Sequence, residues 1–148
     1  MASRKLRTDI QTSKRMAATR SVDTKPELRV RSQLHRLGFR FRLHARDLPG
    51  KPDIVMPKYG TVIRVHGCFW HSHGCADCRA PERNRWYWEP KLARNKRRDM
   101  LTGQQLRRLG WRVLNIWECR LKRMSDVQLA RYLNKFIDTP ARNNSSEC

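Results

Sequence analysis

Apolar positions recur with helical spacing in three segments of the chain. Residues 24–38 open with Thr-Lys-Pro-Glu, which is typical of a helix N-cap with proline in the first turn, and they end at a glycine. Residues 91–109 also end before a glycine, and residues 125–137 open with a second capping pattern, Ser-Asp-Val-Gln. The apolar faces consist of Val30, Leu34 and Leu37 in the first segment and Leu129, Leu133, Phe136 and Ile137 in the last. We therefore expect three helices.

The middle helix has polar residues on its otherwise apolar stripe. The positions that share this stripe are Leu92, Asn95, Asp99, Gly103 and Leu106. Asp99 has neighbours of opposite charge in residues 96–98, so one interpretation is an ordinary solvated charge. Its place between two leucines on the stripe favours the other interpretation, in which its side chain turns inward.

Four short runs of alternating or β-rich sequence predict strands at residues 39–43, 54–56, 61–65 and 111–117. Residues 57–60, Pro-Lys-Tyr-Gly, form a turn that joins the second and third strands into a hairpin. With the centre of this turn between Tyr59 and Gly60, Asp53 and His66 would face each other at the open end of the hairpin.

The order of these elements predicts an α/β chain, with one mixed α+β sheet flanked by helices. Residues 67–90 are dense in His, Cys and Trp, which is typical of a functional insert. At 148 residues the chain has the length of one domain, which we place at residues 21–138. Residues 1–20 are expected to be a flexible basic arm, and residues 139–148 a disordered tail.

The chain has 33 Lys and Arg against 13 Asp and Glu, a net charge of +20. Such an excess indicates a polyanionic partner. With 39% hydrophobic residues the chain can still form a core, which argues against a wholly disordered basic tail. No apolar run reaches the ~18 residues of a membrane span, and the N-terminus lacks the apolar segment of a secretion signal. We therefore expect a folded basic domain in the cytoplasm.

Cysteine and histidine cluster in the insert. Cys68, His73 and Cys75 lie close together, and Cys119, at the end of the last predicted strand, can return to them. Three thiolates and one imidazole suit tetrahedral Zn²⁺, and a site with four protein ligands is structural. The CxxC pair formed by Cys75 and Cys78 allows a second assignment, in which Cys78 replaces Cys68 or Cys119. The remaining alternative is a set of free cysteines beside solvated histidines.

Carboxylates and histidines near the hairpin suit phosphodiester hydrolysis. That reaction needs oxygen ligands for Mg²⁺ and a base that activates water. Asp53 is the best ligand, and His71 is a candidate base because imidazole titrates near neutral pH. The alternatives are structural: Glu27 is already explained by the capping pattern, and Asp53 could be a simple turn acid after proline.

Four blocks of the sequence closely resemble the very-short-patch-repair (Vsr) DNA mismatch endonucleases. They are residues 49–53 (PGKPD), 66–75 (HGCFWHSHGC), 95–99 and 109–119. The resemblance covers residues 14–121, and its HGCFWH block is highly specific. It implies a restriction-endonuclease-like fold and an enzyme that nicks DNA beside a T:G mismatch left when 5-methylcytosine deaminates.

The resemblance also implies roles for single residues. Asp53 would be the central Mg²⁺ ligand and His71 the catalytic histidine and general base. The supporting polar positions, which would act through water, are Glu27, His66 and Asp99. The family pattern has Thr where this chain has Val65, so this position would give Mg²⁺ only a backbone carbonyl. We expect two catalytic Mg²⁺ ions and one structural Zn²⁺, held by Cys68, His73, Cys75 and Cys119.

Exposed aromatic residues in the insert indicate contact with something flat, such as a base. An aromatic wedge between base pairs costs a few kcal/mol of unstacking, and less at a weakly held mismatch. The resemblance implies that Phe69, Trp70 and Trp88 form this wedge, whereas Trp86 has no counterpart. The alternative for each ring is burial against the zinc loop.

Basic residues of segments 1–20, 79–98 and 107–112 would then bind phosphates. The expected partner is double-stranded DNA with a T:G mismatch, bound by a monomer, with a functional link to a cytosine-5 DNA methyltransferase and mismatch-repair proteins. Two other hypotheses stay open. One is a zinc-stabilised DNA-binding module without nuclease activity, and the other is a restriction-type endonuclease that cuts matched DNA.

Overall fold

A four-stranded sheet forms the centre of the computed structural model, which describes residues 9–18, 22–70, 73–76 and 81–139. Its strands lie in chain order. The second strand pairs antiparallel with the first and with the third, and the third and fourth strands are parallel. They are β1 (Arg42–Leu43), β2 (Ile54–Met56), β3 (Thr61–His66) and β4 (Arg112–Trp117). The fold is the mixed sheet flanked by helices that the sequence predicts.

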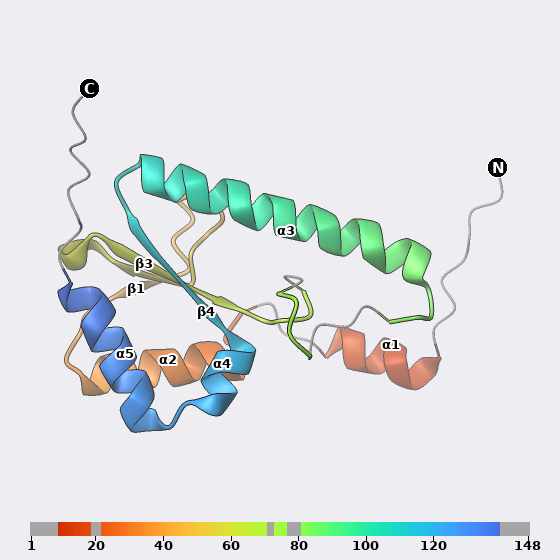
Figure 1. The fold of residues 1–148 in the computed structure, drawn as a ribbon, viewed down its shortest axis with the longest axis horizontal. Helices are drawn as coiled ribbons and strands as arrows, with labels where there is room; N and C mark the ends of the chain where they lie inside the picture. Colours follow the sequence, from red (N-terminus) through yellow and green to blue (C-terminus); the bar gives the residue numbers. More distant parts are fainter. Residues whose placement is uncertain (1–8, 19–21, 71–72, 77–80, 140–148) are drawn as a thin grey trace.

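Helices cover both faces of this sheet (Figure 1). The long helix α3 lies along one face, and α2, α4 and α5 lie on the other. The helix bounds are α1 (Ile10–Ala17), α2 (Lys25–Arg36), α3 (Arg85–Arg108), α4 (Glu118–Arg123) and α5 (Asp126–Asp138). No helix in the described part of the chain combines the length and the apolar character of a membrane span.

Alternation along the strands divides the core between the two faces. Ile54 and Ile63 pack with α2 and α5, whereas Val55 and Val62 pack with Leu106 of α3. Because side chains alternate along a strand, Asp53 lies on the same face as Val55. For the same reason Arg64 and His66 of β3 lie on the same face as Val62. The polar residues at the sheet end therefore point toward α3.

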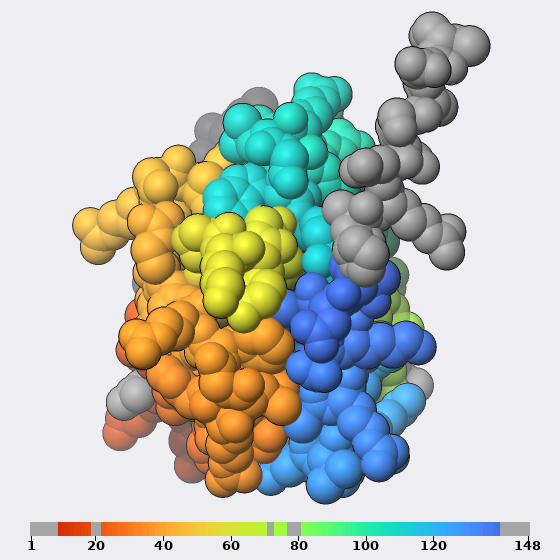
Figure 2. Space-filling view, turned by 90° about the vertical axis from the view of Figure 1, so that its left-hand side faces the viewer, coloured from red at the N-terminus to blue at the C-terminus, as the bar shows by residue number. Residues whose placement is uncertain are grey.

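The register of the predicted hairpin was wrong by two residues. Ile54 pairs with Ile63 and Met56 with Thr61, because residues 57–60 form the whole turn. Pro57 starts a short 3-10 helix, η1 (Pro57–Tyr59), and Gly60 closes it at a φ of 56°. Figure 2 shows this turn, in yellow, between the α2 segment and α5. An even shift keeps every side chain on its face, so Asp53 and His66 still share one face of the sheet.

The helices differ from the sequence-based expectation at several ends. Helix α3 begins at Arg85 rather than residue 91 and carries Pro90 inside it, because Arg85 pairs with Glu89 one turn on and Trp88 is buried. β1 is limited to two residues of the predicted 39–43. Helix α4 was not predicted, and it places Cys119 on a helix rather than on a strand end.

Helix α1 lies inside the segment predicted to be a flexible arm. Asp9 caps it by accepting a hydrogen bond from the Thr12 amide at 2.6 Å, yet none of its residues is buried. A short helix without an apolar anchor leaves no hydrophobic period in the sequence. Residues 1–8 of the arm and 140–148 of the tail lie outside the described residues, so the domain bounds stay a prediction.

Gly50 allows the loop before β2 to pack against α3. Its φ is +71°, and a Cβ there would lie 2.1 Å from Cγ2 of Thr102. We expect Gly50→Ala to lower the free energy of unfolding by about 2 to 4 kcal/mol, from backbone strain and overpacking together. Urea denaturation measures this loss. Gly110→Ala is the matched control, since Gly110 has a φ of +90° but a Cβ added there would meet no atom within 4 Å. Equal losses in the two variants would contradict the packing argument.

Candidate active site and metal centre

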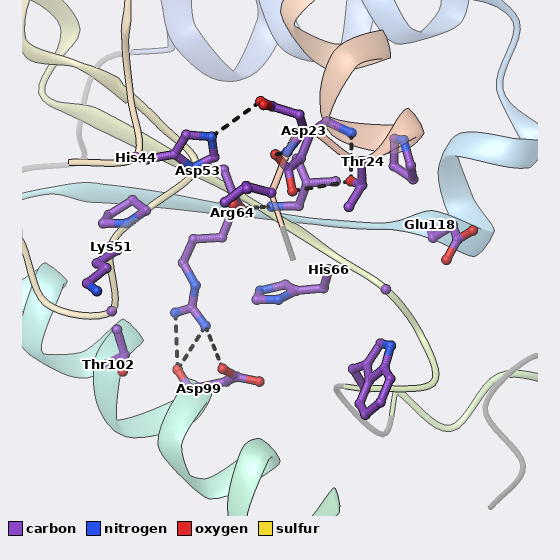
Figure 3. Close-up of a pocket in the computed structure, with 18 of the residues that line it drawn as sticks. Asp23, Thr24, His44, Lys51, Asp53, Arg64, His66, Asp99, Thr102 and Glu118 are labelled. Atoms are coloured by element: carbon purple, nitrogen blue, oxygen red, sulfur yellow. Dashed lines mark hydrogen bonds and ion pairs between the residues drawn. The ribbon is translucent and has the colours of Figure 1, made fainter. Parts of the chain in front are cut away.

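A cavity of about 1490 Å³ opens at the end of the sheet where β2 begins and β3 ends. The N-terminus of α2 borders it on one side and the middle of α3 on the other (Figure 3). Four residues predicted from the sequence line it together: Glu27, Asp53, His66 and Asp99. The fifth predicted catalytic residue, His71, lies outside the described residues.

Asp53 lies at the mouth of the hairpin, just before β2. Its Oδ2 accepts a hydrogen bond from the Val65 amide at 2.7 Å, which fixes the orientation of the carboxyl group. Burial raises the pKa of Asp53 to about 6, and the nearby carboxylate of Glu27 adds to the rise, whereas the Val65 N–H, His44 and Arg64 act against it. A carboxylate whose charge is destabilised in this way is stabilised by a bound cation.

Val65 borders the same cavity from β3. Its amide is engaged with Asp53, so the backbone of β3 lies directly against the carboxyl group. The predicted role of the Val65 carbonyl as an Mg²⁺ ligand stays a prediction.

Glu27 takes part in the capping of α2 and also borders the cavity, and its catalytic role stays a prediction. Thr24 caps α2 by accepting from the Glu27 amide at 3.4 Å, and Glu27 Oε2 accepts from the Asp23 amide at 3.1 Å. The side chain is nevertheless buried and borders the cavity. Arg31, one turn along α2, reaches Glu27 Oε2 at 3.2 Å. The capping residue is therefore also part of the site.

Arg31 organises a charge cluster that the sequence analysis missed. The carboxylates and imidazole of Asp23, Glu27 and His44 approach one another within 4.8 Å. The Arg31 guanidinium lies among them, 2.7 Å from Asp23 Oδ1 and 2.9 Å from His44 Nε2. The positive charge that Asp23, Glu27 and His44 surround is therefore the guanidinium of Arg31. The available signal was the spacing of Glu27 and Arg31, four residues apart on a helix.

His66 and Asp99 approach the cavity from β3 and α3. His66 is buried, with Nε2 3.1 Å from Oδ1 of Asn115 and its ring 4.8 Å from that of Trp117. Asp99 lies beside Arg64, a buried arginine of β3 that the sequence analysis also missed. A charged residue inside the apolar run TVIRVH was the signal that marked it.

The three predicted wedge residues pack against one another. The ring of Phe69 lies 5.1 Å from that of Trp70 and 5.4 Å from that of Trp88. Trp88 is 5% exposed, whereas Trp86 is 42% exposed. Asn95 donates to the Trp70 carbonyl at 3.2 Å and so ties this cluster to α3. Insertion between bases would require these rings to separate, and their role in DNA binding stays a prediction.

The four predicted zinc ligands come together beyond the ends of β3 and β4. One ligand atom from each of Cys68, His73, Cys75 and Cys119 lies within 4.8 Å of the others. His73 Nδ1 is 3.5 Å from Sγ of Cys119 and 3.9 Å from Sγ of Cys68. The His73 ring stacks on Trp117 at 4.0 Å and 9°.

The chemistry of this cluster fits a soft divalent cation. Burial raises the pKa of the Cys68 thiol to about 12, and contacts with the other two thiols act in the same direction, whereas the Cys119 amide N–H lowers it. Thiolates gathered this closely need a cation, and three thiolates with one imidazole are a zinc donor set. Cys78, the alternative ligand, lies outside the described residues.

Comparison of the sequence with known proteins identifies the family of this chain. The family model "DNA mismatch endonuclease Vsr" matches residues 5–77. The DNA mismatch endonuclease Vsr of Escherichia coli K12 is 40% identical over 128 residues, which span 84% of this chain and 82% of that protein. The chain belongs to the Vsr family.

Other members of the Vsr family are named as nicking enzymes. The type II nicking enzyme V.XorIIP of Xanthomonas oryzae pv. oryzae is 47% identical over 113 residues, 76% of this chain and 83% of that protein. The enzyme V.NmeAIP of Neisseria meningitidis is 44% identical over 119 residues, 78% of this chain and 85% of that protein. Family membership makes the chain a DNA endonuclease whose substrate is DNA, and it implies a divalent metal at the site.

Proposed function

We propose that this protein nicks one strand of duplex DNA next to a T:G mismatch that arises from 5-methylcytosine deamination, and so initiates very-short-patch repair. The reaction is Mg²⁺-dependent hydrolysis of a phosphodiester. The observation that carries the proposal is the partly buried Asp53 carboxyl group, held by the β3 backbone in a cavity that Glu27, His66 and Asp99 also line.

Each residue of the site has a role in this proposal. Bound Mg²⁺ would neutralise charge on the phosphate and the leaving oxygen. Asp53 would hold the ion, and the Val65 amide, which donates to Asp53 Oδ2, fixes the orientation of the carboxyl group. Asn115 orients the imidazole of His66. His71 would take the proton from the attacking water.

The cysteine cluster has a structural role. Zn²⁺ bound by Cys68, His73, Cys75 and Cys119 would join the segment after β3 to α4. That segment begins with Phe69 and Trp70, so the zinc would also set the position of the aromatic cluster. A T:G pair stacks and pairs weakly, and rings inserted there would meet a smaller cost than at a matched pair.

A nicking assay tests the proposal. The substrates are two duplexes that differ only in one T:G or T:A pair, each incubated with Mg²⁺ or with EDTA. We expect the protein to nick one strand of the T:G duplex in the presence of Mg²⁺, and to nick neither duplex in EDTA. Binding without cleavage would favour a zinc-stabilised DNA-binding module. Equal cleavage of both duplexes would favour a restriction-type endonuclease. If only the T:G duplex is nicked, a panel of mismatches in varied flanking sequences defines the specificity.

DNA affinity should depend steeply on salt. If about six basic side chains contact phosphates, the slope of log affinity against log salt is about −5, because each contact releases a counterion. Lys51 borders the cavity, so Lys51→Ala should reduce the slope by about one. Lys58 belongs to η1, which joins the end of β2 to the start of β3 and so lies at the opposite end of the sheet from the cavity, and Lys58→Ala should leave the slope unchanged. Fluorescence anisotropy titrations measure both slopes, and equal effects of the two substitutions would contradict the assigned DNA-binding end.

A further inference from the structure

The carboxylates of the cavity differ in their partners. Glu27 is paired with Arg31, and Asp99 lies beside Arg64. Asp53 receives a backbone N–H, and the chain gives it no arginine at ion-pair distance among the described residues. A site for two divalent cations usually shares several carboxylates between the ions. Of these three carboxylates, Asp53 is the one without an arginine at ion-pair distance in the described part of the chain, and it is the one placed to bind a cation directly.

Arg64 is a buried residue of β3 that lines the cavity. Its side chain is 8% exposed, and both Nη1 and Nη2 lie 3.1 Å from the backbone carbonyl of Asp99. Nη2 is also 3.8 Å from Oδ1 of the same residue. Figure 3 shows Arg64 and His66 extending from β3 toward Asp99 on α3.

A glycine on α3 provides the space for this arginine. A Cβ at Gly103 would lie 3.1 Å from Nη1 of Arg64 and 3.3 Å from Nη1 of Arg107, tighter than nine in ten real Cβ contacts. A side chain at position 103 would therefore push against both guanidinium groups, and the glycine lets them lie close to α3.

The charge of Arg64 is permanent, since a guanidinium keeps its proton in proteins. It acts on Asp53 as well as on Asp99, because each of these carboxylates interacts electrostatically with Arg64. A divalent cation placed between Asp53 and Asp99 would be repelled by this neighbouring positive charge, and the repulsion is strong in a partly buried site.

We propose that Arg64 takes the place of a second catalytic cation, so that the active site binds one divalent ion, at Asp53. Arg64 is then a positioning residue, which fixes Asp99 on α3 and supplies positive charge where a second ion would otherwise lie. The inference rests on the proposed function of Asp53, and it replaces the sequence-based expectation of two Mg²⁺ ions.

Counting bound Mn²⁺ tests this proposal without relying on turnover. The zinc-loaded native protein is mixed with the T:G duplex, and bound Mn²⁺ is counted by electron paramagnetic resonance while zinc is measured separately. We expect one Mn²⁺ per complex. Two Mn²⁺ in the native complex would overturn the proposal, and this measurement needs no variant that might misfold.

Substitutions then assign the effect to Arg64. Arg64→Met should reduce nicking by on the order of 10²-fold, the usual loss when one preorganised charge is removed, and Arg64→Lys should recover much of it. Nicking by Arg64→Met at the native rate would overturn the proposal. Arg29→Met is the matched control, since Arg29 also bonds a backbone carbonyl, that of Met124 at 2.6 Å, and a carboxylate, that of Asp126 at 3.1 Å, but outside the cavity.

Asp53→Asn separates this inference from the proposed function. It should remove the single Mn²⁺. If the native complex binds one Mn²⁺ that Asp53→Asn leaves in place, the ion lies elsewhere, and the metal site of the proposed function fails together with the inference. If Asp53→Asn removes the ions but the native complex holds two, only the inference about Arg64 fails.

Discussion

Asp53→Asn should abolish DNA nicking and, in the absence of divalent cations, make the folded protein more stable. Asparagine has the same size and keeps an oxygen that can accept from the Val65 amide, but it cannot supply a charged ligand. The loss of nicking should be at least about 10³-fold, as expected when the central metal ligand is removed. The same substitution removes a negative charge that burial disfavours.

The gain in stability has a defined pH dependence. Because the pKa of Asp53 is about 6 in the folded protein and 3.8 in its ordinary state, the folded protein binds the proton more tightly. Both states are protonated below pH ~4, so the native protein and the Asp53→Asn variant should differ little there. As the pH rises from about 4 to 6, the unfolded chain releases a proton that the folded protein retains, so the native protein loses about 2 to 3 kcal/mol of stability.

Urea denaturation of both proteins from pH 4 to 8, with EDTA, measures this difference. The difference in the free energy of unfolding between the Asp53→Asn variant and the native protein should increase from pH 4 to 6 and stay constant above pH 6. Asp47→Asn on an exposed loop is the control, with a change within about 0.5 kcal/mol. If the Asp53→Asn variant is less stable than the native protein at pH 8, Asp53 is not held in a destabilised charged state. At Mg²⁺ concentrations that do not saturate the site, nicking by the native protein should decline as the pH falls through about 6, because the proton competes with the cation for Asp53.

Cys68→Ser should remove the bound zinc and lower the free energy of unfolding by about 3 to 5 kcal/mol. Cys68 is 2% exposed and is the buried member of the ligand cluster, so its loss leaves three ligands that are more exposed to water. Atomic absorption measures the zinc content, and thermal unfolding measures the stability. Nicking should fall as well, because the segment that carries Phe69 and Trp70 follows directly.

Cys78→Ser is the matched control for the zinc prediction. It should keep one zinc per chain and native stability. Loss of zinc from Cys78→Ser together with its retention in Cys68→Ser would establish the alternative ligand set. Absence of zinc from the native protein would favour free cysteines and remove the structural role of the cluster.

Local sequence signals predicted the elements that are stabilised locally. The cap at Ser125 forms with both of its hydrogen bonds, and the stripe of α3 buries Leu92, Gly103 and Leu106. Period-two alternation also placed Asp53 and His66 on one face, even though the register between them was wrong. Such patterns depend on residues close in the chain, and tertiary contacts did not alter them.

The arginines of the site could not be predicted in the same way. Arg31 and Arg64 resemble the other basic residues of a chain with a net charge of +20. Their importance comes from burial and from partners such as His44 and Asp99, which only the folded chain brings near. Long-range charge pairing leaves no period in a sequence.

One indole lies between the two centres of the molecule. The ring of Trp117 is 4.8 Å from that of His66, which borders the cavity, and 4.0 Å from that of His73, which belongs to the cysteine cluster. Both imidazoles therefore pack on the same indole, one tilted against it and the other stacked on it. A single tryptophan side chain thus supports a residue of the cavity and a residue of the cysteine cluster.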